Sequence, residues 1–147
     1  MNEAPPMPIV PAATTAPAYA ETLTRKAEAA AVARRLVREA LVAWQLPDLI
    51  DGATLVVSEL VANAADHARG ETIRVAVTRT RETRIRIAVV DRDPNRRPQL
   101  RAARLDADGG RGLVLVTAMS RAWGVHQMGW GKRVWADLEA SADQEAT

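Results

Sequence analysis

Glu59, Asn63 and His67 recur every four residues along a segment whose other side chains are mostly apolar. On an α-helix, residues four apart lie only about 40° apart around the axis, so these three side chains form one polar ridge. Because their neighbours include Leu55 and Val56, we expect the carboxylate and the amide to be at least partly buried. Burial without partners would cost on the order of 1–3 kcal/mol for the amide and more for the charge. The pattern therefore predicts a polar ligand at the ridge.

A hydrated Mg²⁺ ion is one ligand that suits this ridge, because Mg²⁺ prefers oxygen ligands and keeps several of its waters. A bound ion and a polarised water would satisfy both Glu59 and Asn63. The alternative is a polar stripe that faces solvent, in which Asp66 and His67 cap the helix near its end. The motif alone does not choose between the two interpretations.

Asp91 is a second candidate, because it ends an apolar run over residues 85–90 at the point where a long aperiodic segment begins. A carboxylate at a strand end beside a pocket can accept hydrogen bonds from an exocyclic amine such as that of adenine. The sequence DRDP at residues 91–94 is also a common way to start a turn, so this alternative stays open.

The third candidate is the glycine-rich sequence DGGRGL at residues 108–113, which precedes a predicted helix over residues 113–122. Glycines let the backbone approach a ligand closely, and a helix amino terminus offers unpaired N–H groups and partial positive charge to phosphate. A flexible loop that simply ends in a helix is the alternative interpretation.

The rest of the sequence predicts the elements that hold these groups. Apolar residues at helical spacing predict helices over residues 27–44 and from 48 to about 68. Alternating residues predict two strands, 72–78 and 84–91, joined by a five-residue hairpin loop, and two more at 123–128 and 132–138. This order predicts an α+β fold, a two-layer sandwich with the helices on one face of a mixed, mostly antiparallel sheet.

Composition and length set the domain organisation. A chain of 147 residues suits one domain, which we expect over residues 21–139, between a flexible Pro/Ala-rich tail (1–20) and a polar tail (140–147). Residues 19–25 can supply an edge strand. The absence of cysteine excludes disulfides and thiolate chemistry and is compatible with a reducing, cytoplasmic location. Neither a membrane span, a signal peptide nor the basic, aromatic-rich stripe of nucleic-acid binding is visible.

Taken together, the order and spacing of the three candidates resemble the N box, G1 box and G2 box of the GHKL, or Bergerat-fold, ATPases. Within that superfamily the chain is similar to the anti-sigma-factor serine kinases, and the resemblance covers roughly residues 27–138. The motifs that carry it are SELVANA at residues 58–64 with His67, GGRGL at 109–113, WGV at 123–125 and GKRVW at 131–135.

The resemblance implies ATP and Mg²⁺ as cofactors. It implies that Asn63 coordinates Mg²⁺, that Glu59 activates the attacking hydroxyl or water, and that Asp91 contacts the adenine amine. His67 matches the histidine that usually follows the N box, and residues 92–108 match the nucleotide lid. The phosphates would be wrapped by Gly110, Arg111, Gly112 and Leu113.

One departure from the family pattern concerns the G1 box. It commonly continues from its aspartate through two glycines, whereas this chain reads DRDPN at residues 91–95 and has no glycine between Asp91 and Gly109. Side chains replace an open backbone there, so weaker or altered nucleotide binding is expected.

The resemblance also implies a function. We expect an ATP-binding regulator that phosphorylates Ser or Thr of a STAS-domain anti-sigma antagonist, sequesters a sigma factor, or does both. The alternative is a catalytically inactive ATP-sensing module for protein interaction. A histidine kinase is a weaker expectation, because the chain leaves no room for a phosphoacceptor helical hairpin. A homodimer is expected by resemblance alone.

Overall fold

The computed structural model describes residues 16–67, 71–92 and 110–140. Within these residues the chain forms helices and strands that alternate with short connections. Their order is β1 (Ala18–Thr24), α2 (Ala29–Ala43), the 3₁₀ turn η2 (Pro47–Leu49), α3 (Ile50–His67), β2 (Thr72–Arg81), β3 (Arg84–Arg92), α5 (Gly110–Met119), β4 (Ala122–Met128) and β5 (Gly131–Glu139).

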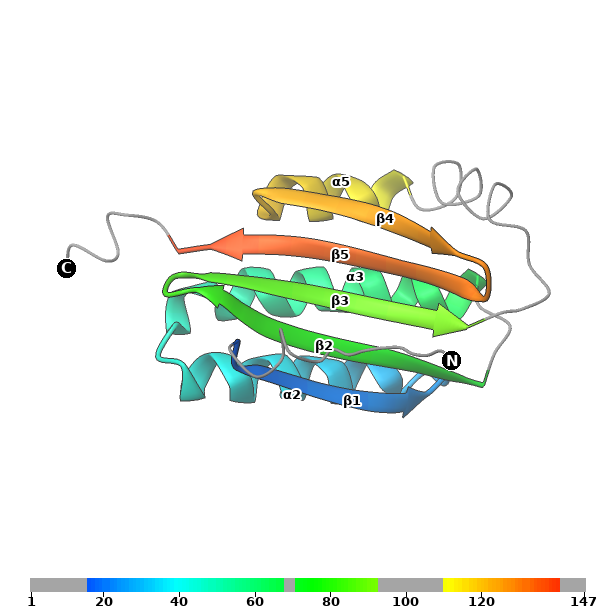
Figure 1. Ribbon diagram of the computed structural model, residues 1–147, viewed down its shortest axis with the longest axis horizontal. Helices are drawn as coiled ribbons and strands as arrows, with labels where there is room; N and C mark the ends of the chain where they lie inside the picture. Colours follow the sequence, from blue (N-terminus) through cyan, green and yellow to red (C-terminus); the bar gives the residue numbers. More distant parts are fainter. Residues whose placement is uncertain (1–15, 68–70, 93–109, 141–147) are drawn as a thin grey trace, which may run out of the picture.

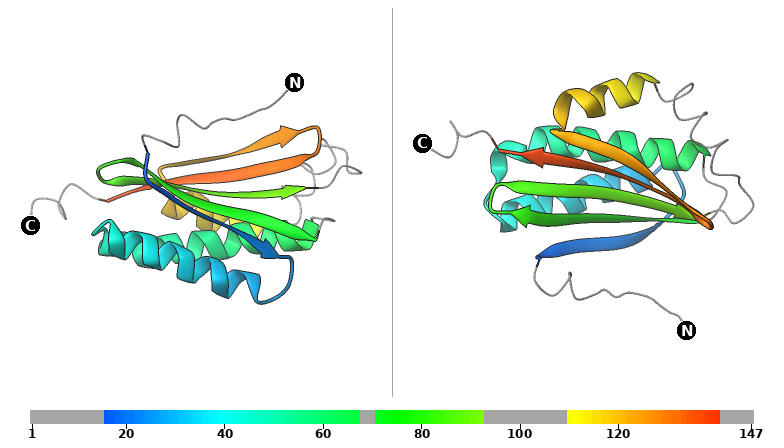
Figure 2. Two further views of the ribbon diagram at one scale, coloured as in Figure 1. Left: turned by 60° about the horizontal axis from the view of Figure 1, so that its bottom comes forward. Right: turned by 45° about the horizontal axis from the view of Figure 1, so that its top comes forward.

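The five strands form one sheet in the order β1-β2-β3-β5-β4. Every neighbouring pair of described strands is antiparallel, so the parallel pairing implied by a mixed sheet is not found there. The described α-helices α2, α3 and α5 lie on one face of the sheet, and the described elements leave its other face without a helix (Figures 1 and 2). The predicted α+β two-layer sandwich is confirmed.

The core lies between the sheet and the helices α2 and α3, and α3 runs beneath the middle strands (Figure 2). Strand alternation puts Ile73, Val75 and Val77 of β2 on the helix-covered face, and Ile85, Ile87 and Val89 of β3 beside them, as the period of two predicts. From α3, Val56, Val57 and Leu60 have no exposed surface. Full burial of each such side chain contributes about 1.5–3 kcal/mol, so α3 is held firmly on the sheet.

Polar contacts fix α3 from the side of α2. Arg34 of α2 donates from Nη1 to Oγ of Ser58 at 3.0 Å, and that hydroxyl donates to the carbonyl oxygen of Thr54. Arg25 donates from Nη1 to the carbonyl oxygen of Ala65, in the last turns of α3, at 3.1 Å. The helix that carries Glu59 and Asn63 is therefore fixed at its middle and near its carboxyl end.

Some predicted boundaries are corrected. The edge strand expected over residues 19–25 is present as β1, which begins and ends one residue earlier, at Ala18 and Thr24. The expected five-residue hairpin loop is a two-residue turn, Glu82 and Thr83, because polar side chains end the apolar alternation while the backbone pairing continues to Arg81. A register shift between Arg79 and Arg81 accompanies this extension.

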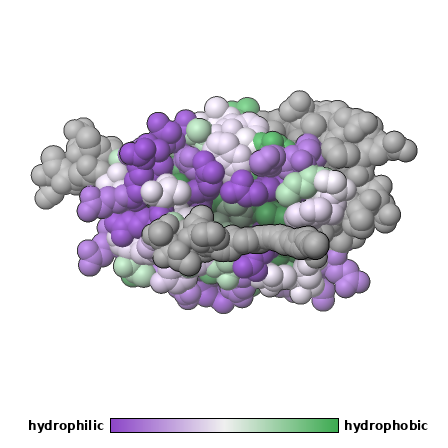
Figure 3. All heavy atoms as spheres, viewed as in Figure 1, coloured by the Kyte–Doolittle hydropathy of each residue, from purple (hydrophilic) through white to green (hydrophobic). Residues whose placement is uncertain are grey.

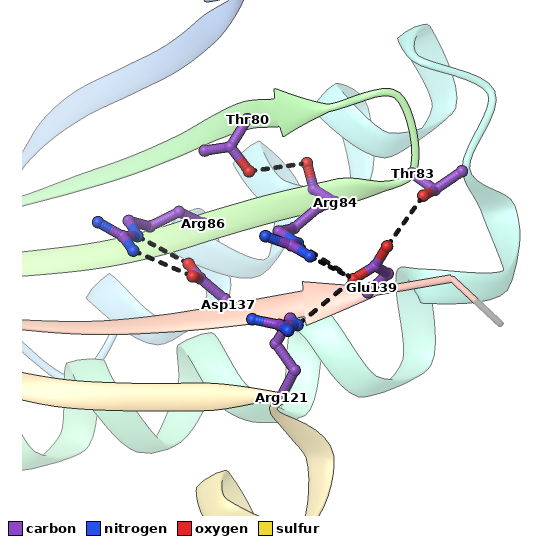
Figure 4. A network of polar contacts seen from close by, with 7 residues as sticks. All are labelled: Thr80, Thr83, Arg84, Arg86, Arg121, Asp137 and Glu139. Atoms are coloured by element: carbon purple, nitrogen blue, oxygen red, sulfur yellow. Dashed lines mark hydrogen bonds and ion pairs between the residues drawn. The ribbon is translucent and has the colours of Figure 1, made fainter.

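A polar network closes the end of the sheet that carries the β2–β3 hairpin (Figure 4). Glu139 accepts hydrogen bonds from Arg84 at 2.9 and 3.1 Å and from Thr83 at 3.3 Å, and it pairs with Arg121 at 3.4 Å. These contacts, led by the hydrogen bonds from Arg84, lower the pKa of the Glu139 carboxyl. In Figure 3 the hydrophilic surface gathers over this end of the open face.

Beside this network, Arg86 is held in a fixed orientation on the open face. It donates two hydrogen bonds to Asp137, at 2.7 and 3.0 Å, and its guanidinium carbon lies 4.2 Å from the ring centre of Trp135. The hydrogen bond to Asp137 raises the pKa of Arg86. On the same face, burial together with the like charge of Arg86 lowers the pKa of Arg133.

Within the described ranges, no helix has both the length and the apolar character needed to cross a membrane.

Candidate functional site

The last turns of α3 carry the predicted polar ridge. Asn63 is buried, with 7% of its surface exposed, and its Nδ2 meets no hydrogen-bond acceptor among the described residues. Glu59, one turn earlier, is partly exposed. A polar stripe facing solvent is therefore the wrong interpretation for Asn63. His67 is the last residue of α3, and its side chain lies outside the described part of the structure.

A row of five residues crosses the sheet at the same end. Asp91 pairs in register with Ile73 on one side and with Lys132 on the other, and Lys132 pairs in turn with Gln127 of the edge strand. Leu23 continues the row beyond Ile73. Asp91 follows Val89 by two residues, so the row lies on the face that the helices cover.

Asp91 and Lys132 form a buried ion pair in this row. Each side chain has 1% of its surface exposed, and Nζ of Lys132 lies 3.9 Å from Oδ2 of Asp91. Asp91 is therefore a buried residue of β3, which runs on to Arg92, and the rest of the alternative turn at residues 91–94 lies outside the described residues. Taking these two charges out of water costs several kcal/mol for each. The attraction between the two charges offsets part of this desolvation penalty.

Gln127 is a site residue that the sequence reasoning missed. Both polar atoms of its side-chain amide are buried and make no hydrogen bond to any described residue. Lys132 belongs to the GKRVW motif, and its alternation with Val134 and Ala136 indicates the buried face of β5. Alternation along β4 likewise indicates that Gln127 lies on the helix-covered face. This indication is weak, because β4 is a short edge strand.

The amino terminus of α5 lies at this end of the molecule too. Gly110, Arg111, Gly112 and Leu113 form the first turn of α5, which corrects the prediction of a glycine loop ahead of a helix that starts at residue 113. Their side-chain surroundings lie outside the described part, as does all of the predicted lid after Arg92. Fully buried Val116 holds α5 on the core, and Trp123 Nε1 donates to Thr117 Oγ1 at 2.7 Å.

Figures 1 and 2 show how these segments converge. The carboxyl end of α3, the end of β3, the start of β5 and the first turn of α5 share one end of the sandwich in all three views. The helix amino terminus contributes partial positive charge there. The structure thus brings the elements of all three predicted motifs to one end, opposite the Glu139 network.

The side chains fit a nucleotide with its metal ion. The buried Nδ2 of Asn63 has a donor to offer to a phosphate oxygen or a metal-bound water, and its amide oxygen suits Mg²⁺. In the described ranges no group of three His, Cys, Asp or Glu could hold a metal ion by itself. A single protein oxygen supplemented by phosphate and water is the usual way in which Mg²⁺ binds nucleotide sites.

Helices on one face of an antiparallel sheet, with the end of α3, the end of β3 and the start of α5 at one end, are consistent with a GHKL-type ATPase fold. A family model described as histidine kinase-like ATPase domain matches residues 22–138. The chain belongs to this family, and membership implies that it binds ATP. Among curated proteins, none matches the chain significantly.

Proposed function

We propose that this protein is an ATP-binding regulator of the anti-sigma-factor type, which transfers the γ-phosphoryl group of ATP to Ser or Thr of a STAS-domain partner, sequesters a sigma factor, or does both. The observation that supports it best is the buried Asn63 amide, which lacks an acceptor among the described residues, at the end of the sheet that carries Asp91. ATP with Mg²⁺ would supply the phosphate oxygen or metal-bound water that the Asn63 amide needs as a hydrogen-bond acceptor.

Each residue has a distinct role in this proposal. Asn63 holds Mg²⁺ through its amide oxygen, and Asp91 accepts a hydrogen bond from the adenine amine. The first turn of α5, with Gly110, Arg111 and Gly112, presents backbone N–H groups to the phosphates. When bound, Mg²⁺ neutralises charge that develops on the phosphate oxygens.

Glu59 is the base in the proposed transfer step. Its carboxylate is partly exposed and lies one helical turn from Asn63, which supports this role. In the proposal, Glu59 lies beside the phosphates and within reach of the partner. The partner's hydroxyl oxygen bonds to the γ-phosphorus, the bond from that phosphorus to the bridging oxygen breaks, and ADP leaves with the electron pair. The hydroxyl proton passes to Glu59.

A thermal-shift titration with ATP and Mg²⁺ tests the nucleotide site. A ligand that binds only the folded state raises the melting temperature, by an amount that grows with ligand concentration. We expect a rise with ATP and Mg²⁺ together and a smaller rise with ATP and chelator. A melting temperature that stays constant up to millimolar ATP would refute the proposal.

A transfer assay separates the kinase from the inactive interaction module. The protein is incubated with Mg²⁺, γ-labelled ATP and a purified STAS-domain protein, with Glu59→Gln as the matched variant. Label on the STAS protein that falls by about 100-fold in Glu59→Gln, with ATP binding retained, supports the kinase. If the unmodified protein and Glu59→Gln both form an ATP-dependent complex with the STAS protein but neither labels it, the inactive interaction module is supported.

A further inference from the structure

Lys132 is a buried cation whose presence in the site needs an explanation. Lysine occurs only at positions 26 and 132, and Lys26 is exposed, whereas Lys132 has none of its surface exposed. A buried ion pair is often no more stabilising than apolar side chains of similar volume. Stability alone therefore does not explain a lysine beside Asp91, and the pair is a candidate for contact with a ligand.

The ion pair offers two complementary groups at one place. Oδ2 of Asp91 and Nζ of Lys132 lie 3.9 Å apart on the same face of the sheet. An ionised carboxylate only accepts hydrogen bonds, and an ammonium group only donates them. A planar base that meets this pair edge-on must therefore present a donor to Asp91 and an acceptor to Lys132.

Both purines can meet this requirement. Adenine has an amine at purine position 6 next to an acceptor ring nitrogen, whereas guanine has a carbonyl oxygen at position 6 next to a ring N–H. A carboxylate alone repels the guanine carbonyl, because both are acceptors. With an ammonium group beside it, the carbonyl gains a charge-assisted hydrogen bond while Asp91 accepts from the ring N–H.

We propose that Lys132 determines base specificity and that the Asp91–Lys132 pair lets the site bind GTP as well as ATP. This inference rests on the proposed function, since it needs a purine to lie against Asp91. Gln127 continues the polar row beyond Lys132, and its amide can offer a donor or an acceptor. Gln127 can therefore form a hydrogen bond with either purine and does not favour one of them.

Titration calorimetry of the full chain with ATP, GTP and ITP, each with Mg²⁺, tests the proposal. ITP shares the carbonyl of GTP and lacks its exocyclic amine, so it isolates purine position 6. We expect GTP and ITP to bind within about ten-fold of ATP. We expect Lys132→Met to weaken GTP and ITP, relative to ATP, by about ten-fold or more, the size of one lost charge-assisted hydrogen bond.

Two control variants accompany this measurement. Lys132→Arg keeps a cationic donor and should keep GTP and ITP binding, and Lys26→Met removes the other lysine and should leave all ratios unchanged. If the unmodified protein binds ATP but rejects GTP and ITP by more than about 100-fold, or if Lys132→Met leaves the ratios unchanged, this inference is wrong while the ATP site stands.

Absence of binding to all three nucleotides would overturn the proposed function and this inference together. The comparison within the unmodified protein needs no variant, so rejection of GTP and ITP there overturns the inference even if Lys132→Met fails to fold.

Discussion

The amide of Asn63 is buried, and its nitrogen meets no acceptor among the described residues. Asn63→Ala should therefore leave the free energy of unfolding within about 1 kcal/mol of the parent, since the amide nitrogen that it removes makes no such bond to a described residue. It should weaken ATP in the presence of Mg²⁺ by about ten-fold or more, through loss of the metal ligand. Titration calorimetry and urea unfolding measure the two effects. Asn63→Asp keeps an oxygen ligand and is expected to bind Mg²⁺-ATP better than Asn63→Ala does. Equal affinity for Mg²⁺-ATP in Asn63→Ala and the parent would contradict the assignment of Asn63 as the metal ligand.

Asp91 is expected to face the base. In Asp91→Asn, an amide N–H₂ group can turn toward the adenine amine, where a carboxylate would only accept. We expect ATP to bind about ten-fold more weakly, as measured by calorimetry. An unchanged dissociation constant would mean that the base binds elsewhere.

Asp91 also balances a buried charge, which gives a prediction that holds without nucleotide. Asp91→Asn leaves Lys132 buried beside a neutral group, so the free energy of unfolding should fall by on the order of 3 kcal/mol. Urea unfolding of the nucleotide-free protein measures this loss. The double variant Asp91→Asn, Lys132→Met should recover part of it, and a single variant as stable as the parent would show that the ion pair has no energetic role.

At the scale of elements, the indole ring of Trp135 on β5 lies directly against the backbone of Gly124 on β4. A Cβ atom added to Gly124 would lie 2.9 Å from Cζ2 of Trp135, the residue that pairs with it across the strands. Gly124→Ala must displace the indole, which also carries the guanidinium of Arg86. We expect a loss of about 1–3 kcal/mol in the free energy of unfolding, measured in urea.

The matched control for this substitution is Gly129→Ala in the β4–β5 turn. A Cβ atom there would meet nothing within 4 Å, so its effect should stay within about 0.5 kcal/mol. If both alanine variants were equally stable, contact with Trp135 would not be the reason for glycine at position 124.

At the scale of the whole molecule, stability should depend on pH through the end of the sheet opposite the proposed nucleotide site. The pKa of Glu139 is lowered in the folded state, mainly by hydrogen bonds from Arg84. Its stabilising effect is therefore complete above the ordinary glutamate pKa and is lost as the pH falls through the lower, folded value. We expect Glu139→Gln to melt below the parent near neutral pH and at the same temperature in strong acid.

Melting temperatures recorded from about pH 7 to about pH 2 test this expectation. Glu21→Gln, on the opposite edge strand β1, is the control for the loss of one carboxylate. A difference between Glu139→Gln and parent that persists unchanged in strong acid would show that the side-chain charge is not responsible.

The sequence by itself determined which residues belong to which face of each element. Periods of two and near four identify Ile73 and Ile85 as core residues, and Glu59 and Asn63 as neighbours on one helix, because these relations are local and follow from backbone geometry. The α+β class follows from the order of such elements. The family resemblance pointed to Asp91 in the same way, through a motif that can be read along the chain.

Only the tertiary structure decided which of these faces meet. Lys132 lies next to Asp91 because β5 enters the sheet between β3 and β4, and Gln127 joins the row through the register of the next strand pair. Strand order and register are set by packing between segments that are distant in the chain, so no local period contains them. The same packing buried the lysine and brought the amino terminus of α5 to the end of the sheet that carries Asn63.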